Sequence, residues 1–476
     1  HKQNRFLSNM TAYISNNLFI NYMNQPYSFH LNRNASELLK NIQLEIAGLS
    51  VFLLSLITLF IEGGFTISVI ATLIYIEPIG ALSIGLFYGL LSISFFQFTK
   101  NKLKTWGKLR QDLDSETTKI ALEGLGGIKD LLILGKTSFF TEMFSSRNYM
   151  KARVNSNHST ISQLPRFYLE LLSIIGLVSF IVLLLFQGKD TTSLISILGV
   201  FVAATFRMIP SLNRIIAGVQ SMKYYSPSLD IIYEELKIDT SKGQAALENM
   251  QFNFQNEINL ENIRFSFNED RVILKDINLK IKKGQTIGII GESGSGKSTL
   301  IDLIIGLHKP TSGQILIDGV SGFQMDQQWR KKIGYVSQSI YLTDDTIKNN
   351  IALGVQKNEI NDLRISELLK QVQLEEFISN LKFGVNTKVG ERGVQLSGGQ
   401  RQRIGIARAL YHEPDVIILD EATSALDNET ERDVMESFNN LIGVKTIIMI
   451  AHRMTTLKDC NFIYKIEKGE GKQFTE

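Results

Sequence analysis

The sequence predicts an all-α membrane domain followed by an α/β domain. Two observations predict this division: long apolar runs occur only in the first half, and short β-rich runs alternate with helical stretches in the second. A chain of 476 residues is also too long for one hydrophobic core. We expect the membrane domain at residues 1–238, a polar linker at 239–256 and the α/β domain at 257–476.

Four apolar runs in the first half are long enough to cross a bilayer, which takes about 20 apolar residues in a helix. They cover residues 49–76, 79–98, 169–186 and 194–209. Short turns at Glu77-Pro78 and at 187–190 pair them as two hairpins. A buried-core interpretation is disfavoured because soluble cores rarely need four runs of this length.

The segment between the hairpins, residues 99–165, is long and basic, whereas the two turns carry almost no positive charge. The positive-inside rule places this segment and the C-terminal domain in the cytosol. Its helical periodicity predicts that the helices leave the membrane as stalks, with a break at 124–129 and a similar break at 26–29.

Net charge and cysteine count limit the partners and sites to expect. The net charge of +3 gives no reason to expect a nucleic-acid partner. Cys460 is the single cysteine, which excludes an internal disulfide and a cysteine-based metal site.

In the second half, continuous apolar strands between helices predict a largely parallel sheet covered on both faces. The expected strands include residues 286–290, 315–317, 416–419 and 446–451.

A glycine-rich motif follows the first of these strands and precedes a helix, as a phosphate-binding P-loop requires. Its glycines let successive backbone N–H groups converge on phosphate oxygens. Lys297 is expected to reach the β- and γ-phosphates of ATP, and the Ser298 hydroxyl to bind Mg²⁺. The residues expected to hold the nucleotide are Gly291, Ser293, Gly294, Gly296, Lys297, Ser298 and Thr299.

The apolar strand at 416–419 runs into Asp420 and Glu421. Beside a P-loop, a carboxylate at a strand's C-terminal end can hold the Mg²⁺ shell, which we assign to Asp420. The next carboxylate, Glu421, is placed to polarise the attacking water. An Asp-Glu pair after a strand is otherwise more often a helix cap.

Residues 396–400, Leu-Ser-Gly-Gly-Gln, match the ABC signature motif. With the P-loop they make residues 258–472 resemble the ABC transporter ATPases, which are P-loop NTPase domains with a helical subdomain. The resemblance implies that Ser397, Gly398, Gly399 and Gln400 bind nucleotide.

Other positions match this family one by one. Phe267 stands where an aromatic ring, usually tyrosine, stacks on adenine. Gln338 resembles the Q-loop glutamine that touches Mg²⁺, and residues 424–427 resemble the D-loop. His452 resembles the switch histidine that contacts the γ-phosphate, although a lone histidine after a strand is more often structural.

The family resemblance implies that two chains work together, because Ser397 and Gly399 face the γ-phosphate held by the other subunit. A homodimer is the simplest arrangement, and a heterodimer stays open. Residues 389–393 resemble the X-loop of exporters, and a membrane domain fused ahead of the ATPase also favours export.

The expected architecture is that of a type IV ABC exporter in the bacterial inner membrane, which usually has six spans. Since the chain opens with His1 rather than Met, we expect a fragment whose first two spans lie upstream. Residues 26–31 and 126–134 then resemble the two coupling helices.

Three stretches, 164–170, 206–216 and 224–233, resemble the PglK-type flippases of lipid-linked oligosaccharides. This resemblance predicts a lipid-linked oligosaccharide or related glycolipid as cargo. A general exporter of drugs, lipids or peptides is the alternative. A non-transport ABC ATPase is disfavoured by the four apolar runs.

Two arginines are candidates for the substrate path. Arg207 lies deep in the fourth run, and Arg166 lies where the third enters from the cytosol. Such an arginine costs at least about 2.5–3.5 kcal/mol in a membrane and should face a cavity or a partner. The pair is expected to receive a pyrophosphate headgroup. The structural alternatives are ion pairs of Arg166 with Glu170 and of Arg207 with Glu62.

Overall fold

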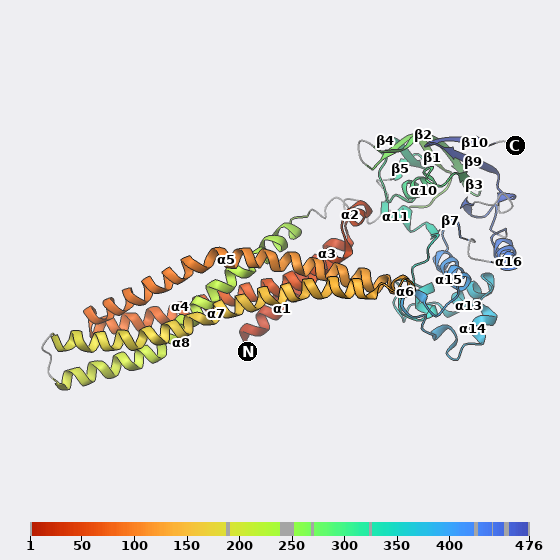
Figure 1. The fold of residues 1–476 in the computed structure, drawn as a ribbon. Helices are drawn as coiled ribbons and strands as arrows, with labels where there is room; N and C mark the ends of the chain where they lie inside the picture. Colours follow the sequence, from red (N-terminus) through yellow and green to blue (C-terminus); the bar gives the residue numbers. More distant parts are fainter. Residues whose placement is uncertain are drawn as a thin grey trace. The chain divides into compact units, whose positions relative to one another are not determined.

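The computed structural model describes residues 2–186, 191–238, 252–267, 271–322, 326–422, 427–439, 441–451 and 457–474. The chain divides into two compact units, residues 1–244 and 245–476. Each unit is considered by itself (Figure 1).

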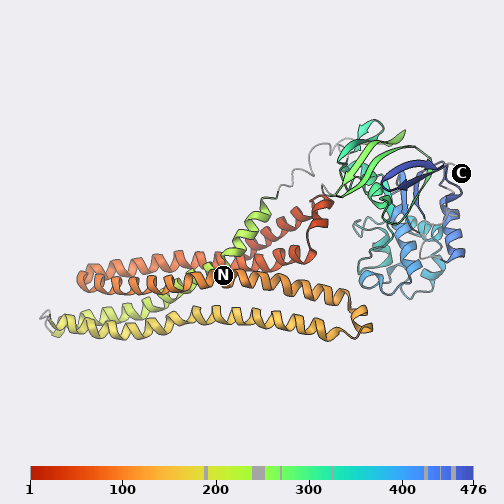
Figure 2. The ribbon, with the colours of Figure 1, turned by 45° about the horizontal axis from the view of Figure 1, so that its top comes forward.

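The described part of the first unit is helical throughout. Its elements are α1 Lys2–Met23, α2 Tyr27–Asn32, α3 Ala35–Lys40, the π-helical turn η1 Asn41–Glu45, α4 Ile46–Ile76, α5 Pro78–Gly126, α6 Ile128–Ile133, α7 Thr137–Phe186 and α8 Thr191–Leu236. The four long helices α4, α5, α7 and α8 lie alongside one another (Figures 1 and 2).

The predicted helical hairpin at Glu77-Pro78 is confirmed. Helix α4 ends at Ile76, and Pro78 opens α5, where its missing N–H costs nothing. At about 1.5 Å per residue, the 49 residues of α5 extend about 70 Å, more than twice the roughly 30 Å of a bilayer core. The predicted continuation beyond the apolar run is therefore present, and the predicted break falls at Gly127.

Two helical stretches among the described residues are long and apolar enough to cross a membrane, Ala35–Ile76 and Leu198–Leu236. They contain the first predicted span and most of the fourth. Residues 79–98 and 169–186, the second and third predicted spans, are helical as well. The turn predicted at 187–190 lies outside the described residues.

A buried polar cluster joins these helices around Glu45, whose side chain is 0% exposed. Its Oε2 accepts hydrogen bonds from Ser228 Oγ at 2.7 Å and Gln111 Nε2 at 3.1 Å. Arg110 lies 3.7 Å from the same oxygen and forms an ion pair with Asp114 at 3.2 Å. Glu45, at the start of α4, is thus joined to α8 by a hydrogen bond and to α5 by a hydrogen bond and an ion pair.

Two glycines let the helices approach closely enough to form this cluster. A Cβ on Gly48 would lie 2.4 Å from Ser228 Oγ, and a Cβ on Gly107 would lie 2.2 Å from the carbonyl oxygen of Tyr224. Glycine at both positions therefore sets the spacing of α4 and α5 against α8.

Glu45→Gln is expected to lower the unfolding free energy by about 3 kcal/mol, because Glu45 pairs with two buried cations and Lys40, 3.7 Å away, would keep its charge while losing this partner. Thermal melting of the purified protein in detergent measures the effect. Glu123→Gln is the matched control, since Glu123 pairs with Lys119 at 3.9 Å on an exposed helix surface. That change should cost under about 1 kcal/mol, and equal shifts for both variants would contradict the prediction.

The described residues of the second unit form a ten-stranded sheet in the order β5-β4-β1-β2-β10-β9-β3-β8-β7-β6. The strands are β1 Glu257–Ser266, β2 Val272–Lys282, β3 Thr286–Gly291, β4 Ser312–Ile317, β5 Val320–Ser321, β6 Ile333–Val336, β7 Val416–Asp420, β8 Thr446–Ile450, β9 Phe462–Glu467 and β10 Glu470–Phe474.

The expectation of a largely parallel sheet is correct for half of it. Strands β9, β3, β8, β7 and β6 pair in parallel, but β5, β4, β1 and β2 pair antiparallel. The difference follows from burial. Strands β7 and β8 are buried at every residue, whereas β1 and β2 alternate buried and more exposed residues, the pattern of a sheet with one solvated face.

Helices complete the second unit. They are α10 Lys297–Ile305, α11 Asp326–Arg330, α12 Ile347–Ile351, α13 Asp362–Gln371, α14 Glu375–Ser379, the 3₁₀ turns η3 Gly384–Asn386 and η4 Glu391–Gly393, α15 Gly398–Tyr411 and α16 Asn428–Asn439. Helices α12 to α15 share a hydrophobic core that also includes Ile417 and Leu419 of β7. This core anchors the helical subdomain to the strand that carries Asp420.

Candidate nucleotide-binding and hydrolysis site

The P-loop connects β3 to α10. Strand β3 lies between β8 and β9, and Ile287 and Ile289 are fully buried. Two turns of the loop require glycine, because φ is +80° at Gly294 and +106° at Gly296. A Cβ on Gly296 would also lie 2.7 Å from Leu274 Cδ2. The sequence therefore forms the tight loop that the motif predicts.

Two polar groups of this loop indicate what it binds. Lys297 Nζ donates hydrogen bonds to the carbonyl oxygens of Gly291 at 2.8 Å and Glu292 at 2.9 Å, so the cation lies inside the loop. Ser295 Oγ is buried without a hydrogen-bond partner among the described residues. A cationic loop at a helix N-terminus with an unsatisfied donor fits a polyphosphate.

Asp420 ends the buried strand β7, and its carboxylate accepts a hydrogen bond from Tyr335 Oη at 3.3 Å. Burial raises the pKa of Asp420 above its ordinary value, and the hydrogen bond from Tyr335 opposes that rise. Burial also raises the pKa of Asp302, on α10, to about 6, and the nearby Asp420 adds to the effect.

These groups fit Mg²⁺. A divalent cation would offset the unfavourable burial of the Asp420 carboxylate. The described residues contain no group of three metal-binding His, Cys, Asp or Glu side chains, but Mg²⁺ typically needs only one or two carboxylates beside substrate phosphates. Asp420, Ser298 and Gln338, the predicted ligands, carry oxygen atoms of the kind that Mg²⁺ prefers.

Glu421 is held at three points. Its backbone N–H donates to the Ile450 carbonyl oxygen at 3.1 Å, and its own carbonyl accepts from Gln402 Nε2 at 3.2 Å. Its carboxylate accepts from Gln338 Nε2 at 2.6 Å. Its φ of +51° is left-handed, which is uncommon for glutamate and is often found at functional sites. Two predicted site residues, Gln338 and Glu421, are thus in direct contact.

The signature motif caps α15. Gln400 N–H donates to Ser397 Oγ at 3.2 Å, and Ser397 N–H donates to Gln400 Oε1 at 2.9 Å, which makes a reciprocal capping box. Gly398 and Gly399 occupy the first turn of α15. Because neither has a side chain, a phosphate can approach the N–H groups of this helix end.

Phe267 follows β1 and is 49% exposed. Its ring meets Phe265 edge-on at 4.9 Å and His308 edge-on at 5.5 Å. About half of the Phe267 side chain is therefore accessible for stacking with a base. His452 and residues 424–426 of the predicted D-loop lie outside the described residues.

Sequence reasoning missed Tyr335, Asp302 and Gln402. Tyr335 lies in the strand before Gln338, and Gln402 lies two residues after the signature motif. Their residue types are common on ordinary surfaces, so only the contacts to Asp420 and Glu421 distinguish them.

Of the two ion pairs expected for the candidate substrate-path arginines, one is present and the other is replaced by a different pair. The ion pair of Glu62 is with Arg214 at 3.0 Å, not with Arg207, whose guanidinium lies 4.8 Å from the centre of the Phe65 ring. The reason is the antiparallel register of α4 and α8, which also brings Gly218 beside Ser55. The pair of Arg166 with Glu170 is present at 2.9 Å on an exposed helix surface.

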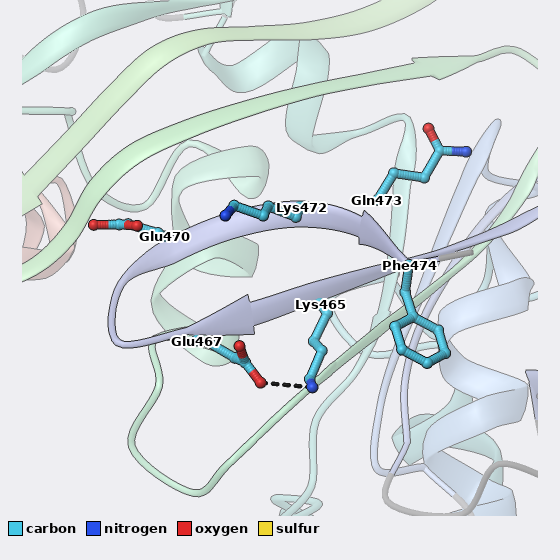
Figure 3. A pocket seen from close by; sticks show the side chains of 6 residues that line it. All are labelled: Lys465, Glu467, Glu470, Lys472, Gln473 and Phe474. Carbon is cyan, nitrogen blue, oxygen red and sulfur yellow. Dashed lines mark ion pairs between the residues drawn. The ribbon is translucent and has the colours of Figure 1, made fainter. Parts of the chain in front are cut away.

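A surface pocket of about 280 Å³ lies on the β9–β10 hairpin. It is lined by Lys465, Glu467, Glu470, Lys472, Gln473 and Phe474 (Figure 3). Lys465 forms an ion pair with Glu467 at 2.5 Å. The lining contains no residue of the nucleotide site.

Fold and site together define an ATPase domain of the ABC class, in which a P-loop and a signature motif belong to one chain. The family model described as "ABC transporter" matches residues 274–424. The ATP-dependent lipid A-core flippase of Pasteurella multocida is 31% identical over 431 residues, which are 88% of this chain and 72% of the flippase. The chain belongs to the ABC transporter family.

Other relatives match smaller shares of their own length. The heterocyst differentiation ATP-binding protein HepA of Nostoc is 34% identical over 75% of this chain, which spans 58% of HepA. The leukotoxin translocation ATP-binding protein LktB of Mannheimia glucosida is 46% identical over 45% of this chain, which spans 30% of LktB.

A solved structure, a bacterial Atm1-family ABC exporter with ATP bound, has the same fold with a TM-score of 0.85. It is 23% identical, and the match covers 98% of this chain and 82% of that one. Membership of the ABC transporter family makes the α/β domain of the present chain an ATP hydrolase that works with Mg²⁺.

Proposed function

We propose that the chain is one half of an ATP-driven exporter that flips an amphipathic lipid across the bacterial inner membrane, with its ATPase domain in the cytoplasm. The observation that carries this proposal is the combination of two helical stretches long and apolar enough to cross a membrane with an ABC ATPase domain in one chain. We propose residues 1–238 as the membrane domain, 239–256 as the linker and 257–476 as the ATPase domain.

In the proposed mechanism, the P-loop N–H groups and Lys297 bind the β- and γ-phosphates. Ser298, Asp420 and Gln338 would hold Mg²⁺, and the bound ion would supply positive charge beside the phosphate oxygens. The Glu421 carboxylate accepts a proton from the attacking water, and its contact with Gln338 fixes where that carboxylate points. His452 contacts the γ-phosphate, and Phe267 stacks on adenine.

Ser397 and Gly399 of a second chain would close the same nucleotide from the opposite side. The helix end at Ser397 supports this role, because its hydroxyl accepts from Gln400 N–H and keeps its own proton to donate. The second chain is most simply another copy.

For the cargo we propose a lipid-linked oligosaccharide or a related glycolipid. The relatives named as lipid A-core flippases support a lipid carrier, since they match most of this chain, including the membrane half. The alternative is general export of drugs, lipids or peptides. The toxin-translocation relatives give only weak support to this alternative, because their matches cover 45–49% of this chain.

ATPase assays in proteoliposomes separate these cargoes. Stimulation by polyprenyl-pyrophosphate-linked glycans, with none by drugs or peptides, is the expected result. Stimulation by drugs or peptides alone would move the protein to the general exporters.

Arg207→Ala and Arg166→Ala are each expected to lower flipping of a pyrophosphate-linked lipid about tenfold or more, while basal ATPase activity survives. The physical reason is that a guanidinium binds phosphate oxygens in a bidentate fork. Both arginines are exposed within the single chain. The Arg207 guanidinium lies over the Phe65 ring, and Glu62 pairs with Arg214 instead. Quenching of a fluorescent lipid in proteoliposomes measures flipping.

Arg147→Ala is the matched control, because Arg147 lies on the same helix as Arg166 and pairs with Glu116 at 2.8 Å. Its flipping rate should stay unchanged. If Glu170→Ala restores flipping to Arg166→Ala, Arg166 serves only its ion pair. Normal flipping in both arginine variants would remove them from the substrate path.

A further inference from the structure

We infer that Gln402 is a positioning residue for Glu421 and joins it to the signature helix α15. The inference rests on the proposed role of Glu421 in hydrolysis. Gln402 lies in the second turn of α15 and is 3% exposed. Its Nε2 donates to the carbonyl oxygen of Glu421 at 3.2 Å.

The Glu421 backbone needs such a restraint. A non-glycine residue in the left-handed region costs of order 1–3 kcal/mol and persists only where surrounding contacts enforce it. The hydrogen bond from Glu421 N–H to Ile450 fixes the peptide before the residue. The hydrogen bond from Gln402 fixes the peptide after it. Together they set φ and ψ, and therefore the direction in which the carboxylate leaves the backbone.

Helix α15 also holds the chain that follows Gln338. Arg408 Nη1 donates to the Tyr341 carbonyl oxygen at 2.8 Å. A Cβ on Gly405 would lie 2.6 Å from Ile340 Cδ1, so the helix and this segment are in close contact. One helix thus contacts both the Glu421 backbone and the segment that carries its side-chain partner, Gln338.

The consequence concerns turnover rather than binding. Displacing a reacting group by about 1 Å can cost about 10²-fold in rate. Gln402 does not belong to the P-loop or to the expected Mg²⁺ ligands, so its loss should leave nucleotide affinity unchanged. Loss of a residue that only stabilised the fold would not lower the turnover rate while leaving nucleotide affinity unchanged.

The test compares Gln402→Met with the wild-type protein, using the purified full chain in nanodiscs. Methionine keeps the length of the side chain and removes the amide donor. We expect kcat to fall about tenfold or more, while KM for ATP and binding of a fluorescent ATP analogue stay within about twofold. Gln402→Leu, which also lacks the donor, should lose kcat in the same way and serves if the methionine variant does not fold.

Gln285→Met is the matched control. Gln285 Oε1 accepts from Lys282 N–H just before β3, at the opposite end of that strand from the P-loop, and kcat should not change. Wild-type kcat in a folded Gln402 variant, or an equal loss in kcat and ATP affinity, would overturn the inference. Glu421→Gln measured beside it separates the two claims: if that variant stays active, the proposed role of Glu421 fails, whereas if it is inactive and Gln402→Met is normal, only the inference fails.

Discussion

Glu421→Gln is expected to bind ATP normally and to lose turnover by about 10²–10⁴-fold, the usual contribution of a general base. The amide keeps the size of the side chain but cannot accept a proton from water. Because binding survives without hydrolysis, the variant should accumulate as an ATP-bound closed dimer. Phosphate release and size-exclusion chromatography in the presence of ATP and Mg²⁺ measure the two effects.

Glu413→Gln is a matched control for this change. Glu413 has the same φ of +51° in the same domain, but its side chain is exposed on the surface. Its turnover should equal that of the wild-type protein. Near-normal hydrolysis in Glu421→Gln would remove Glu421 from the chemistry and require another base.

Mixing two inactive variants is expected to restore ATPase activity in part. Lys297→Ala removes the cation of the P-loop, and Ser397→Arg places a bulky side chain at the signature helix end. Each variant alone should be inactive. In a mixed dimer, the intact P-loop of one chain meets the intact signature motif of the other, so one complete site forms.

ATPase rates across mixing ratios measure this rescue. Vanadate trapping shows whether the mixed dimer holds a nucleotide in its complete site. A mixture of wild-type and doubly substituted Lys297→Ala, Ser397→Arg chains is the control, because a mixed dimer of these two contains no complete site. If neither hydrolysis nor trapping recovers at any ratio, the site is not shared between chains.

The sequence predicts best those features that depend on local chemistry. The P-loop needs glycines at positive φ, and Gly294 and Gly296 both have a positive φ. The helix break at Glu77-Pro78 follows from proline geometry, and the buried strand before Asp420 follows from a continuous apolar run. Each of these can be derived from a few neighbouring residues.

Features that depend on register between distant segments were predicted poorly. The partner of Glu62 is set by how α4 slides along α8, and no local pattern encodes that distance. The antiparallel half of the sheet was missed because its alternation of buried and exposed residues is weaker in sequence than the runs of the parallel half. Gln402 and Tyr335 are likewise recognisable only once α15 and β6 lie beside Asp420 and Glu421.

The left-handed backbone at Glu421 also bears on how such a chain can evolve. Glycine takes this conformation without strain, so a change to glycine would relieve a penalty of order 1–3 kcal/mol while removing the carboxylate. Selection for transport alone keeps the glutamate in place. After a gene duplication, one copy could pair with an active sister chain and would no longer need its own glutamate. Substitutions at residue 421 would then tend toward a residue without the backbone strain. Backbone strain at residue 421 therefore favours loss of the glutamate wherever its ATP site is not needed, and the hydrogen bond from Gln338 opposes that loss.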